Sequence, residues 1–109
     1  MNARSDDADS AAGNNFATLK LQEKRLTGYL QGIDLQKELL GLLEQGYAEV
    51  VVDMASVELI SSAVIGTLVG LERDFRLRNV RLVLSDLQPA VHKILATTGV
   101  VGLFKIRDK

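Results

Sequence analysis

The sequence contains no cysteine and no tryptophan, and it has only one histidine and one proline. The absence of cysteine excludes disulfides, thiolate metal sites and cysteine nucleophiles. One histidine does not suffice for a histidine-rich zinc site. Aromatic residues make up 5% of the chain, so leucine, valine and isoleucine must fill the core. We therefore expect neither a metal site nor a cofactor.

Long apolar runs are also absent. No stretch approaches the roughly 20 residues that a membrane-spanning helix needs, and the segment MNARSDDADSAAGNN lacks the apolar run of a signal peptide. The formal net charge of −1 gives no general attraction to nucleic acid. We expect a cytoplasmic protein that neither inserts into membranes nor binds nucleic acid directly.

The length and composition predict one folded domain. The chain has 109 residues, of which 47% are hydrophobic, enough for a modest core. Residues 1–15 are small and polar and include three aspartates, which predicts a disordered tail. The domain should then span residues 16–109.

The first part of this domain predicts strands followed by a helix. Leucines alternate with polar residues over 16–30, which indicates two short strands or one bent strand near a sheet edge. A helical stripe follows, with Asp34 as its expected N-cap and Gly46 as its expected stop. The leucines behind these two predictions are Leu19, Leu21, Leu26 and Leu30 for the strands, and Leu35, Leu39, Leu42 and Leu43 for the helix.

The second part alternates between buried strands and amphipathic helices. The β-branched run at 50–52 is typical of a parallel strand covered by helices on both faces. A helix is expected over 62–77, a strand over 79–86, a helix from Pro89 to a stop at Gly99, and a strand over 103–106. The order β-β-α-β-α-β-α-β predicts an α/β fold with parallel β-α-β units. The buried stripe of the helix at 62–77 consists of Val64, Leu68, Leu71 and Phe75.

No constellation of residues predicts catalysis. His92, the only histidine, is expected on the surface of the last helix. The serines at 61–62 lack the flanking glycines of a nucleophile elbow, and no phosphate-binding glycine motif is present. Asp53 and Glu58 fit loop or cap positions better than a hydrolytic site. The arginines of ERDFRLRNVR are interleaved with acids and are typical of a solvated helix face.

Ser61 and Ser62 lie where a buried strand passes into a helix. Either hydroxyl would serve as the N-cap and accept hydrogen bonds from free backbone N–H groups. A phosphate at this position is compatible with the fold, because it adds about −1.5 to −2 charges at the positive end of the helix dipole. The surface would change sign while the helix persists.

The segment VVVDMASVELISSAVIGTLVGL, followed by NVRLVLSDLQPAVHKILATTGVVGLFKI, resembles the STAS domain, and specifically bacterial anti-sigma factor antagonists. The corresponding residues are Asp53-Met54, Ser61-Ser62-Ala63, Pro89, and Thr98-Gly99 through Leu103-Phe104-Lys105-Ile106. The match is good over 48–107 and loose over 16–47. It implies a single-domain STAS-like fold with a mixed, mostly parallel sheet.

The resemblance also implies a role in transcription regulation by partner switching, without enzymatic activity. In this family the unmodified antagonist binds an anti-sigma factor, usually a serine kinase. Phosphorylation of the first serine, here Ser61 with Ser62 as the alternative, blocks that binding, and a serine phosphatase reverses it. We expect the partner to contact Ser61, Ser62, Gln31 and Ile65, since Ile65 departs from the buried stripe one turn after the serines.

Several residues depart from the family pattern. Ile60 replaces an aspartate before the serines, Ala63 replaces a glycine after them, and Gln31 replaces an acid. Gln88 replaces the serine or asparagine that usually precedes Pro89. Fewer acids reduce the charge repulsion that a phosphoserine at Ser61 would meet, or remove groups that a kinase recognises.

Two other functions fit the same residues. One is a STAS scaffold or accessory subunit of a signalling or transport complex that is not phosphorylated. The other is a small-molecule sensor with its pocket at the strand ends near Asp53.

Overall fold

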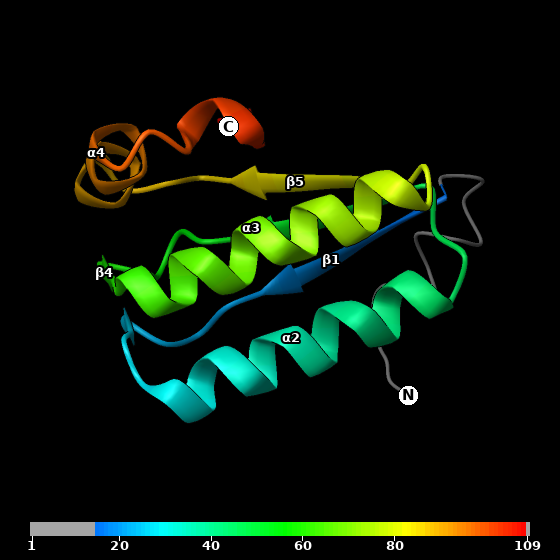
Figure 1. Ribbon diagram of the computed structural model, residues 1–109, viewed down its shortest axis with the longest axis horizontal. Helices are drawn as coiled ribbons and strands as arrows, with labels where there is room; N and C mark the ends of the chain where they lie inside the picture. Colours follow the sequence, from blue (N-terminus) through cyan, green and yellow to red (C-terminus); the bar gives the residue numbers. More distant parts are fainter. Residues whose placement is uncertain (1–14, 109) are drawn as a thin grey trace.

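The structure is a computed structural model that describes residues 15–108, so all but the last residue of the tail predicted over 1–15 lies outside the described residues. Its elements follow the predicted order, with a short strand and a 3-10 turn in addition (Figure 1). The strands are β1 (Phe16–Lys20), β2 (Arg25–Leu26), β3 (Glu49–Asp53), β4 (Leu59–Ile60), β5 (Arg81–Ser85) and β6 (Lys105–Arg107). The helices are α2 (Tyr29–Glu44), α3 (Ser62–Leu77) and α4 (Pro89–Thr97), and the turn is η1 (Val101–Leu103).

The main sheet has the order β1-β3-β5-β6, and every described pair in it is parallel. β2 and β4 form a separate parallel pair. The main sheet grows in one direction, so right-handed crossovers place successive helices on one face. α2 and α3 accordingly lie together in front of the sheet in Figure 1. The expectation that helices cover both faces is therefore wrong for the described residues.

The core lies between this helical layer and the sheet. Val50 and Val52 of β3 pair in register with Leu82 and Leu84 of β5, and all four belong to the same buried cluster as side chains of α2, α3 and α4. Each buried aliphatic side chain contributes roughly 1.5–3 kcal/mol. Val51 points to the other face and is also buried, which accounts for the continuous apolar run in the sequence.

The start of α2 differs from the prediction. The helix begins at Tyr29 with Gly28 as its N-cap, six residues before the expected start at Leu35, and Asp34 is an exposed residue of its second turn. Leu30, expected in a half-buried strand, is a helical residue that is 70% exposed. The prediction failed because the cap bears no side chain, so the usual Ser, Thr, Asp or Asn signal is missing.

The ends of the helices are closer to the prediction. Gly46 and Gly99 follow the C-caps of α2 and α4 with φ of 84° and 80°, the left-handed conformation that glycine adopts without a steric penalty. Both expected stops are confirmed. The last strand begins later than expected, at Lys105, because η1 takes up residues 101–103.

Candidate functional site

The short strands β2 and β4 bring the amino ends of α2 and α3 together. Arg25 pairs with Leu59, and Leu26 pairs with Ile60. The Ser61 N–H extends this pairing by donating to the Leu26 carbonyl oxygen at 3.0 Å. Because each strand leads directly into a helix, α2 and α3 begin at the same end of the molecule, on the left of Figure 1.

Ser61 is the N-cap of α3. Its backbone is extended, with φ −88° and ψ 162°, and its hydroxyl oxygen accepts a hydrogen bond from the Val64 N–H at 3.2 Å. The Ser61 carbonyl oxygen accepts the first helical bond from the Ile65 N–H at 2.9 Å. The expected capping role is confirmed and belongs to Ser61. The residue is half-buried, so its hydroxyl still faces solvent in part.

Ser62 is the first helical residue of α3 and is exposed. Among the described residues, its hydroxyl makes no hydrogen bond, in contrast to that of Ser61. The two serines thus differ in role as well as in exposure. Ser61 holds the helix end, whereas Ser62 lies on the surface beside it.

The residues on either side of the serines explain two departures from the family pattern. Ile60 is 4% exposed and belongs to the core cluster, a position where an unpaired carboxylate would be costly. Ala63 is exposed on the first turn of α3. The apolar residue at 60 therefore has a packing role, whereas the small residue at 63 leaves the surface beside Ser62 open.

Ile65 does not lie on the surface. It is 5% exposed and packs in the core, so the expectation that it contacts a partner is wrong. Its neighbour Val64 is also buried, and together they widen the buried face of α3 at its first turn. The error arose because a buried helix face is broader than the stripe at every third or fourth residue.

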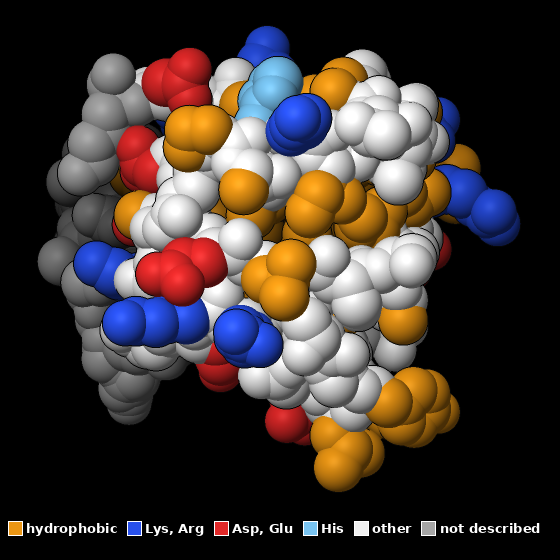
Figure 2. Space-filling view, turned by 90° about the vertical axis from the view of Figure 1, so that its left-hand side faces the viewer, with side chains coloured by type: hydrophobic (Ala, Val, Ile, Leu, Met, Phe, Trp, Pro, Cys, Tyr) orange, Lys and Arg blue, Asp and Glu red, His pale blue; other side chains and the backbone are white. Residues whose placement is uncertain are grey.

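Exposed apolar side chains at this end come from other elements. Tyr29 and Leu30 are 78% and 70% exposed on the first turn of α2, and Leu59 of β4 is 39% exposed. We call these three residues the amino-end patch. Figure 2 looks onto this end of the molecule and shows hydrophobic side chains projecting at its lower right. Exposed apolar groups gathered at one end are typical of a contact surface.

Sequence reasoning missed the amino-end patch, although a signal for it exists. Extending the period of Leu35 and Leu39 backwards reaches Gly32 and Gly28, and leaves Tyr29 and Leu30 off the buried face. An apolar pair off that face must be exposed once the helix includes it. The signal is visible only if α2 is known to start at Tyr29.

Gln31 holds the start of α2. Its side-chain oxygen accepts hydrogen bonds from the backbone N–H groups of Gly28 at 2.9 Å and Thr27 at 3.0 Å. This ties down the link between β2 and the first turn of α2, which carries Tyr29 and Leu30. The structure thus gives Gln31 a positioning role, while a direct contact with a partner stays a prediction.

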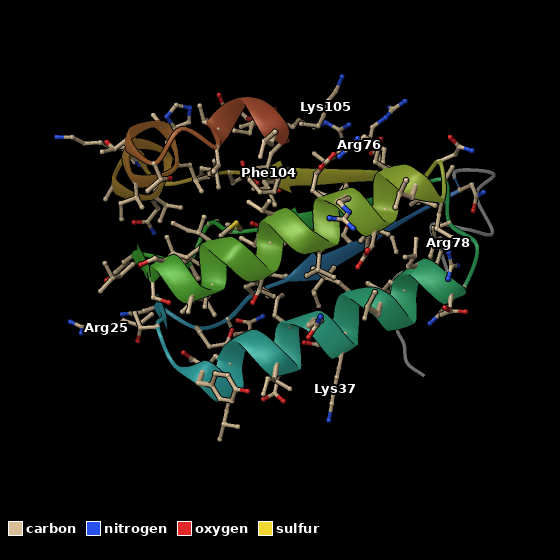
Figure 3. The ribbon with its side chains drawn as sticks, in the orientation of Figure 1. Arg25, Lys37, Arg76, Arg78, Phe104 and Lys105 are labelled. Atoms are coloured by element: carbon tan, nitrogen blue, oxygen red, sulfur yellow. The ribbon has the colours of Figure 1, made fainter. Side chains whose placement is uncertain are left out.

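The first turns of α2 and α3 favour negative charge. Neither α2 nor α3 has an acidic residue in its first turn, and each helix presents the positive end of its dipole here. Arg25 projects away from the molecule beside these helix ends (Figure 3). A phosphate on Ser61 would thus meet favourable partial charges.

The other residues weighed in the sequence have structural or surface roles. The Asp53 carboxylate accepts a hydrogen bond from the Ala55 N–H at 2.9 Å and so shapes the turn after β3. Glu58 and His92 are exposed, as expected for His92 on α4. Gln88 caps α4 without a side-chain bond to that helix, because its amide donates to the Ala55 carbonyl oxygen at 2.7 Å.

Residues 15–108 show neither a metal-binding cluster nor a membrane-spanning helix. Within that range no three histidine or acidic side chains lie close enough together to hold a metal ion. None of the helices described there combines the length and apolar character needed to cross a membrane.

Comparison with known proteins agrees with this fold. The family model described as the STAS domain matches residues 30–109. The unphosphorylated form of the anti-sigma factor antagonist SpoIIAA superposes with a TM-score of 0.71 at 15% identity, covering 87% of this chain and 81% of that one. The phosphorylated form of the Bacillus cell fate determinant SpoIIAA gives a TM-score of 0.66 at 14% identity, covering 88% and 84%.

The fold also occurs outside antagonists. A sulfate transporter family protein from Wolinella succinogenes superposes with a TM-score of 0.70 at 13% identity, covering 85% of this chain and 76% of that one. At such identities the likeness concerns the fold, and the family model carries the assignment. The chain belongs to the STAS domain family.

Proposed function

We propose that the chain is an anti-sigma factor antagonist that acts by partner switching. The unmodified form binds an anti-sigma factor that is also a serine kinase, and phosphorylation of Ser61 releases it. The observation that carries this proposal is the position of Ser61, a partly exposed N-cap at the end of the molecule that also presents Tyr29 and Leu30.

The modification is compatible with the local structure. The kinase transfers the γ-phosphoryl group of ATP to the Ser61 hydroxyl oxygen, so that a new O–P bond replaces the bond to ADP and the kinase's base takes the hydroxyl proton. The phosphate adds about −1.5 to −2 charges and three acceptor oxygens. These oxygens can accept from the free N–H groups in the first turn of α3, as the hydroxyl now does with Val64.

Release of the partner then follows from the changed charge of the contact surface, while the core keeps its packing. Ile60, Val64 and Ile65 around the serine are buried and do not need to move when the phosphate is added. The contact face, in contrast, gains a strongly hydrated dianion beside apolar residues. A partner that buries those residues would have to dehydrate the phosphate, which is costly without a matching cation. A serine phosphatase restores the binding form by hydrolysing the O–P bond.

A second candidate is a STAS binding module that is never phosphorylated. It is supported by the presence of the same fold in a sulfate transporter family protein. In that case Ser61 serves only as the cap of α3, and the amino-end patch binds a constant partner in a larger complex.

The experiment that separates the two uses purified kinase-type anti-sigma factors from the source organism, each incubated with the chain and ATP. We expect one of them to bind the chain and to phosphorylate Ser61, as mapped by mass spectrometry. Ser61→Asp should weaken binding by about tenfold or more, while the control Ser62→Asp weakens it less. Absence of phosphate from both serines, together with unchanged binding by Ser61→Asp, would exclude partner switching through this site.

A further inference from the structure

A groove lies at the amino ends of β5 and β6, at the opposite end of α3 from Ser61. Its volume is about 590 Å³. The carboxyl-terminal half of α3 forms one wall with Arg76, and the segment from η1 into β6 forms the other with Leu103 and Lys105. The groove is thus separate from the amino-end patch, and also from the strand ends near Asp53 where the sequence suggested a sensor pocket.

The arrangement of the last helices leaves this groove open. α3 runs along the sheet in Figure 1, whereas α4 is seen nearly end-on beside the carboxyl end of β5. The segment that faces α3 across the start of β6 is η1, which has only three residues. A short turn in place of a long helix leaves a hollow between α3 and the start of β6.

The floor of the groove is apolar and recessed. Leu82 and Phe104 are buried and belong to the core cluster, while the rim residue Leu103 is 49% exposed. Figure 3 shows Phe104 in the same part of the molecule as Arg76 and Lys105. An apolar group that enters the groove would contact this floor and withdraw Leu103 from water, which is favourable.

Three cations surround the apolar floor with hydrogen-bond donors. The Arg76 Nε donates to Glu72 at 3.3 Å, and an Nη of Arg81 donates to Glu49 at 3.1 Å. Each guanidinium has five N–H groups, so both keep donors that bond to no other described residue. Lys105 forms an ion pair with none of the acids within residues 15–108.

The positive charge at the groove persists when its surroundings are counted. Three cations and one acid line the groove, a surplus of two positive charges. The charged residues that adjoin the lining, within two positions along the chain or by pairing with such a residue, number three of each sign and cancel. They are Arg73, Arg78, Arg107, Glu44, Glu49 and Asp74. Among the described residues, the charges at the groove therefore favour an anionic occupant.

We propose that this groove binds a small amphipathic anion. Its carboxylate or phosphate head lies at Arg76, Arg81 and Lys105, and its apolar chain lies on Leu103 and Phe104. The volume falls within the range of about 300–1,000 Å³ that is usual for small-molecule sites. The recessed floor suits one narrow apolar group better than the broad surface of a protein partner. Binding there does not depend on Ser61, so it is compatible with either function proposed above.

The test titrates the isotope-labelled full chain with hexanoate and with hexyl phosphate, followed through its backbone amide NMR signals. We expect at least one of these anions to cause saturable shifts at Val80, Leu103 and Lys105, and the tighter of the two identifies the head group. Acetate lacks the apolar chain and 1-hexanol lacks the charge. Each should bind at least about tenfold more weakly, because each keeps only half of the recognised chemistry.

Two pairs of variants assign the binding to the groove. Lys105→Gln should weaken binding of the tighter anion about tenfold, whereas Lys37→Gln, on α2 and away from the groove (Figure 3), should not. Leu103→Asn should also weaken binding, whereas Leu77→Asn changes an exposed leucine outside the lining and should not. Because all four side chains are exposed, every variant should melt within about 4 °C of the unchanged chain.

Four outcomes would overturn the proposal. Neither anion could cause a saturable shift, or acetate or 1-hexanol could bind as tightly as the anions that combine both features. Lys37→Gln could weaken binding as much as Lys105→Gln, which would place the anion elsewhere. Finally, a short polyglutamate peptide could bind this groove more tightly than both anions, which would make an acidic protein segment the occupant.

Discussion

The amino ends of α2 and α3 lie at the same end of the molecule but are built differently. The N-cap of α2 is Gly28, which has no side chain. The side-chain oxygen of Gln31, within the helix, accepts a hydrogen bond from the Gly28 N–H. The N-cap of α3 is Ser61, whose own hydroxyl accepts from Val64. The outer surface of the first helix end is apolar, whereas that of the second carries hydroxyls.

This difference gives the two helix ends different roles in the proposed switch. Gln31 fixes the link into α2 by accepting from the N–H groups of Thr27 and Gly28, and Tyr29 and Leu30 beside it form an apolar surface. Because a hydroxyl satisfies the α3 end, that end can be modified without losing its cap. One helix end thus provides the contact surface, and the other provides a group that changes its charge.

The largest expected loss of stability comes from the buried face of α3, beneath the serines. Ile65→Ala should lower the free energy of unfolding by about 2–5 kcal/mol, since it removes core contacts and leaves a cavity. Leu30→Ala, which shortens an exposed side chain of the amino-end patch, should change it by less than about 0.5 kcal/mol. Urea unfolding of both variants measures the contrast, and similar losses would contradict the burial of Ile65.

The next effect separates the two serines. Ser61→Ala should destabilise the chain by about 1 kcal/mol, within the usual range of 0.5–2 for a lost N-cap. Ser62→Ala should stay within about 0.5 kcal/mol, because the Ser62 side chain does not cap the helix. Ser61→Asp retains an acceptor and serves as the control. A larger loss from Ser62→Ala in thermal unfolding would reverse the assignment of the cap.

Removing the side-chain acceptor at the start of α2 should destabilise the chain less than the loss of core packing does, and by an amount similar to the loss of the Ser61 cap. Gln31→Ala leaves the Thr27 and Gly28 N–H groups to water and should cost about 0.5–1.5 kcal/mol. Gln31→Glu keeps the acceptor and adds a favourable charge, worth about 0.3–1 kcal/mol at low salt. Unfolding of both variants at low and high salt tests this. If Gln31→Glu proved as destabilising as Gln31→Ala, the side-chain oxygen would not be the acceptor.

The smallest expected loss of stability comes from an ion pair at the opposite end of the same helices. There Arg78, the C-cap of α3, pairs with Glu44 of α2 at 3.2 Å (Figure 3), with side chains 55% and 68% exposed. Such exposed pairs contribute about 0.2–1 kcal/mol and are weakened by salt. Arg78→Ala should therefore cost less than about 1 kcal/mol in urea unfolding, and a loss as large as that of Ile65→Ala would show that this end is the more critical one.

Much of the fold could be predicted because periodic patterns dominate it. The valine run of β3 and the stripe of α3 each specify one type of structure over several residues, and Gly46 and Gly99 mark helix stops by their conformational freedom. The start of α2 could not be predicted in this way. Its cap is a glycine, while Asp34 offers a better local cap signal that the tertiary structure overrides.

The candidate site was predictable to the same degree. A cap at Ser61 or Ser62 follows from the change of period at the strand-to-helix junction, and the structure assigns it to Ser61. The contact residues depend on which helix face is buried, and that is set by packing against α2 and the sheet. An error of a few residues at the start of α2 therefore hid Tyr29 and Leu30, and the breadth of the buried face of α3 made Ile65 look exposed.

The most direct test of the switch is a calorimetric titration of one kinase-type anti-sigma factor with the chain in three forms. These are the unmodified chain and chains carrying phosphoserine at Ser61 or at Ser62. We expect the unmodified form to bind and phosphoserine at Ser61 to lower the affinity about tenfold or more, with a smaller loss for phosphoserine at Ser62. Equal affinities for the unmodified form and the form phosphorylated at Ser61, or a larger loss from phosphate on Ser62, would contradict a switch at Ser61.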